Sequence, residues 1–187
     1  GAMYRAITYY FLSENIDADD IENIKSRLDS ININFTDGQM FLNGQDISIE
    51  IRTPEVTQNV SDYSKVNCIR DKMQVYQRGI ALDQSVVMDG RDIGTVVFPY
   101  AELKLFMNAS ANTRAQRRYE ELTKKGEKVT FKEILENVQS RDFIDSTRAD
   151  SPLVKAKDAI EIDNSNLSII EQFDKIYTLA KTKIASL

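Results

Sequence analysis

The stretch from residue 86 to residue 99 constrains the fold of this 187-residue chain more than any other. It begins with the apolar residues 86–88 and breaks into a charged turn, in which glycines, among them Gly94, flank Arg91 and Asp92. Glycine lets the backbone approach a ligand closely, a guanidinium donates to phosphate oxygens, and a carboxylate accepts. A strand followed by an anion-binding loop is typical of an open α/β fold. The alternative is a solvated hairpin with an Arg-Asp pair.

Composition excludes several kinds of chemistry. The chain has no histidine and one cysteine, Cys68, which removes Ser-His and Cys-His nucleophiles and an internal disulfide, and no residue pattern predicts a metal site. The net charge of −5 argues against a nucleic-acid-binding surface. No apolar run reaches membrane-spanning length. We therefore expect a globular protein of the cytoplasm, and nothing in the sequence requires more than a monomer.

Hydrophobic periodicity predicts the order of the elements. Helical spacing covers residues 2–12 and 20–28, and alternation over residues 31–51 predicts a three-stranded antiparallel meander whose third strand is 47–51. Two further helices are expected at 54–60 and 66–79.

The second half of the chain alternates short apolar runs with helical segments. Strands are expected at 86–88, 103–107 and 159–162, with a basic helix at 111–125. Two capping boxes, Thr130 with Glu133 and Ser168 with Glu171, begin further helices. The last helix is expected to pack inward through Ile169, Phe173, Ile176, Tyr177 and Ala180. The sequence thus predicts an α/β fold with a parallel sheet flanked by helices, in which the meander is an insertion.

Arg141, Asp145 and Arg148 are spaced by four and three residues, so on a continuous helix they share one face. One interpretation is an intrahelical salt bridge, but exposed pairs of this kind contribute only ~0.5 kcal/mol. The other is an oxyanion clamp, because phosphoryl transfer is favoured by positioned cations and needs no side-chain nucleophile.

The chain resembles the bacterial cytidylate kinases, which phosphorylate CMP and dCMP from ATP. The segments that carry the resemblance are residues 1–6, 41–44, 51–56, 89–99, 117–119 and 145–149. Each is weak alone, and their order along the chain makes the set specific; the 89–99 segment argues against UMP and dTMP kinases. The resemblance implies a parallel sheet of the P-loop nucleoside monophosphate kinase type, direct phosphoryl transfer, and Mg²⁺ bound with ATP.

The resemblance also implies roles for single residues. Cytosine would be recognised by Ser61, Arg70 and Asp92, the ribose or its neighbourhood by Arg141 and Asp145, and the CMP phosphate by Arg5, Arg91 and Arg148. Catalysis would rest on Arg91, Arg141 and Arg148, while Arg117 and Arg118 would be lid residues that close over ATP. Arg70 is expected on the polar side of its helix.

One feature of the family is not found in these residues. The sequence contains no Gly-x-x-x-x-Gly-Lys-[Ser/Thr] loop, which in the family precedes the segment matching Gly1, so we expect the P-loop and first strand to be missing from this chain. The expected parts are a kinase core at 1–29 and 61–187, an insert that binds the nucleoside monophosphate at 30–60, and a lid at about 114–130. The alternatives are a fragment or module that binds CMP without phosphotransfer, and a scaffold protein without nucleotide selectivity.

Overall fold

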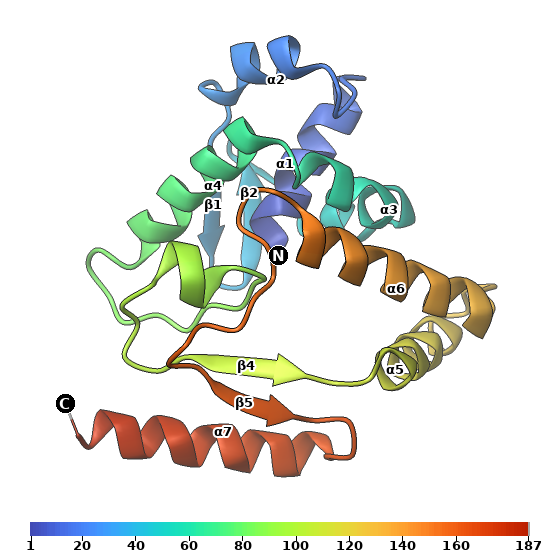
Figure 1. Cartoon of the computed structure of the whole chain (residues 1–187). Helices are drawn as coiled ribbons and strands as arrows, with labels where there is room; N and C mark the ends of the chain where they lie inside the picture. Colours follow the sequence, from blue (N-terminus) through green and yellow to red (C-terminus); the bar gives the residue numbers. More distant parts are fainter. Residues whose placement is uncertain (187) are drawn as a thin grey trace. The chain divides into compact units, whose positions relative to one another are not determined.

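The computed structural model describes residues 1–186, and the chain divides after Gly90 into two compact units. The first unit contains α1 (Ala2–Ser13), α2 (Ile21–Leu28), β1 (Ile33–Thr36), β2 (Gln39–Leu42), β3 (Gln45–Asp46), the 3₁₀ helix η1 (Glu50–Arg52), α3 (Pro54–Tyr63) and α4 (Asn67–Ile80). The second contains the π-helical turn η2 (Ile93–Val97), β4 (Leu105–Asn108), α5 (Ala111–Lys124), α6 (Phe131–Thr147), β5 (Ile160–Asp163) and α7 (Ile169–Ile184) (Figure 1).

Helix α1 forms the centre of the first unit. Its residues Ile7 and Phe11 are fully buried, and the helix contacts α3, α4, η1 and β2. Phe11 stacks on Tyr63 of α3 with ring centroids 6.0 Å apart. The Tyr63 hydroxyl donates to the carbonyl oxygen of Ile16 at 2.7 Å. The helices predicted in this part of the sequence are confirmed: α3 and α4 pack against α1, and α2 packs against α4.

The antiparallel meander is confirmed, with Ile33 opposite Leu42 and Phe41 opposite Asp46. The expectation of a third strand over residues 47–51 is wrong. Asp46 accepts a hydrogen bond from the backbone N–H of Ser48 at 2.9 Å, which turns the chain after a two-residue strand. Ile47 and Ile51 are buried while Ile49 is 81% exposed, so this segment has the spacing of a helical turn rather than of a strand.

Strands β4 and β5 of the second unit are parallel neighbours, with Leu105 opposite Ile160 and Asn108 opposite Asp163 (Figure 1). Helix α5 packs against α6. Both predicted capping boxes are present, at the start of α6 and of α7. A parallel strand pair accompanied by helices confirms the α/β fold.

The strand expected at residues 86–88 is not formed: the segment has no regular structure, and Val87 is fully exposed. A strand is stabilised by the ladder it shares with a neighbour, and within residues 1–186 the two sheets include no strand that pairs with this segment. Apolar composition alone therefore does not make a strand here.

The expectation that α7 packs inward is also wrong. None of its described residues is buried, and Ile169 and Phe173 are 88% and 61% exposed. Phe173 instead stacks on Tyr177, with ring centroids 5.6 Å apart. The amphipathic pattern is present, but burial of a helix face also requires an opposing surface of matching width. No helix among the described residues is long and apolar enough to cross a bilayer.

Candidate active site

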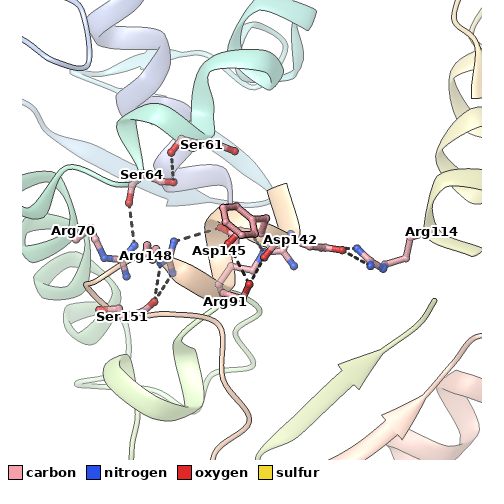
Figure 2. A network of polar contacts seen from close by, with 11 residues as sticks. Ser61, Ser64, Arg70, Arg91, Arg114, Asp142, Asp145, Arg148 and Ser151 are labelled. Atoms are coloured by element: carbon pink, nitrogen blue, oxygen red, sulfur yellow. Dashed lines mark hydrogen bonds and ion pairs between the residues drawn. The ribbon is translucent and has the colours of Figure 1, made fainter. Parts of the chain in front are cut away.

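A buried carboxylate between two arginines is the centre of the polar network in the second unit. Asp145, in the last turn of α6, is 6% exposed. Its Oδ2 lies 2.9 Å from Nε of Arg91, and its Oδ1 lies 3.5 Å from Nη1 of Arg148 (Figure 2). Arg148 caps the helix in an extended conformation. The predicted neighbourhood of Asp145 and Arg148 is therefore real, although the helix ends before Arg148.

The loop that follows α6 orients Arg148. The Nε and Nη2 of Arg148 donate to the carbonyl oxygen of Ser151 at 2.8 Å and 2.6 Å. Ser151 is buried and has a φ of 48°, a left-handed conformation that turns its carbonyl back toward the helix end. The backbone N–H of Leu153 donates to the carbonyl oxygen of Asp145 at 2.7 Å. The carbonyl oxygen of Ser151 and the carboxylate of Asp145 thus fix the guanidinium of Arg148 from two sides.

Arg141 lies one turn before Asp145 on α6. Within residues 1–186 its buried Nε has no hydrogen-bond partner. Burial lowers the pKa of Arg141, and the positive charges of Arg91 and Arg118 lower it further, while Asp145 opposes this shift. Three guanidinium groups thus act on one another here, an arrangement that favours a bound anion.

Asp92 begins the π-helical turn η2 and is 4% exposed. Its backbone carbonyl accepts from the N–H groups of Thr95, Val96 and Val97 at 3.3, 2.8 and 3.3 Å. Single π turns are rare and occur frequently at functional sites. The predicted glycine-flanked loop is therefore a helical turn, and Asp92 is the residue directly before it.

Gly94 packs against a lysine side chain. A Cβ at this position would lie 3.3 Å from Cδ of Lys104. Lys104 is fixed by the two carboxylate oxygens of Asp158, at 2.9 Å and 2.8 Å, and by the carbonyl oxygen of Pro99. The packing of this lysine is one reason for a glycine at this position, and the expected approach of a ligand to the backbone stays a prediction.

The two expected lid arginines lie on α5 and have different partners. Arg117 donates to the side-chain and backbone oxygens of Asn164 at 3.2 Å and 2.6 Å, in the loop between β5 and α7. Arg118 pairs with Glu121 at 2.9 Å. Glu121 also pairs with Lys125, and these two hydrogen bonds, that of Lys125 first, lower the pKa of Glu121.

The remaining predicted residues belong to the first unit. Arg5 on α1 donates to the carbonyl oxygen of Ile51 at 3.1 Å and to the hydroxyl of Thr57 at 2.9 Å. Ser61 lies on α3, half-buried.

Arg70 was expected on the polar side of its helix, α4. That expectation is wrong, because Arg70 is buried, with an exposed fraction of 1%. It donates to the carbonyl oxygen of Ser64 at 3.1 Å, and its guanidinium lies 5.8 Å from the ring centre of Tyr4. A fully buried arginine is uncommon and needs compensating contacts, so this position is more constrained than the helical pattern indicates.

One ion pair of the second unit was not anticipated. Nη1 and Nη2 of Arg114 on α5 lie 2.8 Å and 2.6 Å from the two carboxylate oxygens of Asp142 on α6 (Figure 2). The signal for it was the pair of adjacent predicted helices: in an antiparallel helix pair the start of the first lies opposite the end of the second. Neither residue belongs to the segments that carry the family resemblance.

The α/β fold is that of a nucleoside monophosphate kinase, a phosphotransferase, and the comparisons with known proteins show this class. A model of the family described as cytidylate kinase matches residues 1–182. The chain belongs to the cytidylate kinase family.

Curated relatives agree with this assignment. The chain is 49% identical over 184 residues to a cytidylate kinase of Clostridium tetani, an alignment that covers 98% of this chain and 81% of the relative. It is 50% identical over 188 residues to a cytidylate kinase of Flavobacterium psychrophilum, covering 96% and 83%. A cytidylate kinase of Thermosipho melanesiensis is 48% identical over 183 residues, covering 98% and 83%.

Proposed function

We propose that this enzyme transfers the γ-phosphoryl group of ATP to CMP and dCMP, giving CDP or dCDP and ADP. An oxygen of the acceptor phosphate forms a bond to the γ-phosphorus, and the bond from that phosphorus to the oxygen bridging to the β-phosphate of ATP breaks. The names of the relatives support the acceptor. The observation that carries the proposal is the buried Asp145 between Arg91 and Arg148, with Arg141 in the same neighbourhood.

The acceptor phosphate would be bound by Arg91 and Arg148. A buried carboxylate that holds two guanidinium groups orients their remaining N–H donors before substrate arrives, which reduces the entropy that binding costs. Arg91 is suited to contact a ligand, because its side chain is 48% exposed while it is bonded to Asp145. In the proposed complex Arg141 and Asp145 contact the ribose or its surroundings. Arg5 enters the proposal as a phosphate ligand through the family resemblance alone.

Asp92 would select cytosine over uracil. Cytosine presents an exocyclic amine donor where uracil presents a carbonyl acceptor, so an acceptor-only carboxylate accepts a hydrogen bond from cytosine and faces a second acceptor in uracil. The burial of Asp92 increases this difference, because the contact of two acceptors is poorly screened away from water. Ser61 and Arg70 enter the cytosine site through the resemblance.

On the ATP side, Arg118 is the more suitable of the two lid arginines. Its bond to Glu121 joins residues three positions apart on one exposed helix face, and a phosphate could replace that carboxylate at small cost. Arg117 is engaged with the loop at Asn164. Within residues 1–186 no group of three or more acidic or cysteine side chains is placed to hold a metal ion. The family resemblance implies Mg²⁺ bound with ATP, and no role in the proposed reaction is assigned to that ion here.

Calorimetric titration with CMP, and with UMP as the control nucleotide, tests the acceptor site without requiring ATP. Wild-type protein should bind CMP at least about tenfold more tightly than UMP. Asp92→Asn should remove most of that preference, while Asp89→Asn, on an exposed side chain three residues earlier, should keep it. Equal affinity of the wild-type protein for the two nucleotides would reject the assignment of Asp92.

A second candidate is a fragment or module that binds CMP without phosphotransfer. CMP binding without formation of CDP from ATP would support it. The missing P-loop segment, the proposed insert and lid boundaries, the monomeric state, the lack of nucleic-acid binding and the cytoplasmic location stay predictions.

A further inference from the structure

Helices α5 and α6 pack as a hairpin with a defined contact near each end. Close to the turn between them, Tyr119 and Phe131 meet edge to face, with ring centroids 6.4 Å apart. At the open end, Arg114 and Asp142 form two parallel hydrogen bonds of 2.8 Å and 2.6 Å. The Nε of Arg114 also donates to the carbonyl oxygen of Ala109 at 3.0 Å, just before α5 begins. This pair therefore fixes both the separation of the helices and the start of α5.

The same hairpin carries like charges on its facing helices. Arg118 follows Arg114 by one turn of α5, and Arg141 precedes Asp142 on α6. Burial and the charges of Arg91 and Arg118 lower the pKa of Arg141, while the carboxylates of Asp145 and Asp142 raise it. The Nε of Arg141 is buried without a partner among the described residues. The guanidinium groups of Arg118 and Arg141 repel each other, so α5 and α6 need a compensating attraction close to these two residues. The two-bonded pair of Arg114 and Asp142 supplies it.

We propose that the Arg114–Asp142 pair is a positioning element for phosphoryl transfer, which holds Arg118 and Arg141 together as two cations facing one transferred phosphoryl group. The proposal rests on the function proposed above, in which Arg118 lies on the ATP side, and on the catalytic role that the family resemblance implies for Arg141 beside its contact near the ribose. Neither Arg114 nor Asp142 needs to touch a substrate. Their effect is to set the distance between two groups that would otherwise separate.

The pair has the properties that this task requires. A bidentate contact fixes direction as well as distance, unlike a single ion pair. Both side chains are about one-third exposed, at 36% and 35%, so the contact is partly shielded from solvent. Its partners lie on different helices, which makes it sensitive to their relative motion.

A double-mutant cycle in the full-length enzyme tests the proposal. Asp142→Asn and Arg114→Gln should each lower kcat about tenfold, because small misplacements of phosphate-binding groups are costly. Each should raise the KM for CMP less than it lowers kcat, because the pair positions Arg118 on the ATP side and reaches CMP only through Arg141. The double variant should be no slower than the slower single variant, because the two residues act through one contact.

The control is Glu161→Gln, which breaks the similarly exposed pair of Lys155 and Glu161 in the same unit. It should lower the melting temperature about as much as Asp142→Asn and leave kcat within about twofold of wild type. The proposal is rejected if Asp142→Asn also leaves kcat within that range, or if the two single effects multiply in the double variant. If the wild-type enzyme phosphorylates another nucleoside monophosphate and not CMP, the proposed acceptor is wrong, and the cycle is measured with the accepted one.

Discussion

The Nε of Arg91 lies 2.9 Å from Oδ2 of Asp145, so a half-exposed arginine before the π turn is tied to a buried carboxylate at the end of α6. Asp145 holds Arg148 on its other oxygen. One carboxylate thereby orients two guanidinium groups, and its removal should affect both. The two arginines of the proposed phosphate site therefore both depend on Asp145.

Arg148→Ala should weaken CMP binding far more than cytidine binding, because cytidine lacks the phosphate that Arg148 is proposed to hold. Loss of a charge-assisted hydrogen bond costs roughly 1.5–3 kcal/mol, a factor of about 10–150 in Kd. Calorimetry with the two ligands measures the difference. An equal loss of affinity for CMP and cytidine would show that Arg148 acts on the structure of the site and not on the phosphate.

Asp145→Asn should lower the free energy of unfolding by about 3 kcal/mol, because Arg148 loses its carboxylate while its side chain is only 8% exposed. Urea unfolding measures this change. The matched control on the same helix is Glu136→Gln, which breaks an exposed pair with Lys132 and should cost no more than about 0.5 kcal/mol. Equal costs at both positions would mean that Asp145 is not an energetic centre of the network.

Tyr63→Phe should make the stability of the first unit less sensitive to alkaline pH. Burial raises the pKa of the Tyr63 phenol, and the nearby carboxylates of Asp17, Asp62 and Glu55 raise it further. A pKa raised in the folded state gives stability that is present below the unfolded value, about 10, and is lost as pH rises through the folded value.

At neutral pH the Tyr63 variant should lose about 1 kcal/mol with the hydrogen bond to Ile16. Above pH about 10 its stability should converge on that of the wild type. Unfolding curves between pH 7 and 11 measure both effects, with Tyr100→Phe, on an exposed side chain, as the control. A constant difference across this range would contradict the prediction.

Gly94→Ala should destabilise the protein by about 1 kcal/mol, because the new Cβ would lie 3.3 Å from the fixed side chain of Lys104. In a Lys104→Ala background the same substitution should cost little. Gly79→Ala is the contrasting case: it lies inside α4 with no described atom within 4 Å of the added Cβ, and should stabilise by about 1 kcal/mol. Thermal unfolding of the variants measures these changes in stability. A change of the same sign at Gly94 and Gly79 would contradict the packing argument.

Features that depend on neighbouring residues were predictable from the sequence. The capping box of Thr130 and Glu133 is satisfied within one turn, and Pro54 begins α3 after its cap, Thr53. The third strand of the meander failed because Asp46 turns the chain through its bond to Ser48, and a hydrophobic pattern does not register such a local bond.

Features that depend on distant segments were not predictable in this way. The burial of Arg70 and the exposure of Phe173 are set by the surfaces that the chain brings to each helix. The pair of Arg114 and Asp142 depends on how two helices align. For the candidate site, the sequence predicted which residue types would gather, while the carboxylate that orients Arg91 required the structure.

The partnerless Nε of Arg141 among the described residues implies that this protein is less stable than its fold allows. A partly buried cation that repels its neighbours costs free energy in every folded molecule, whether or not a nucleotide is bound. Arg141→Met should therefore raise the melting temperature while it abolishes turnover. A screen for heat-resistant variants would then enrich substitutions of Arg141 that abolish catalysis. Directed evolution for stability should therefore keep Arg141 unchanged.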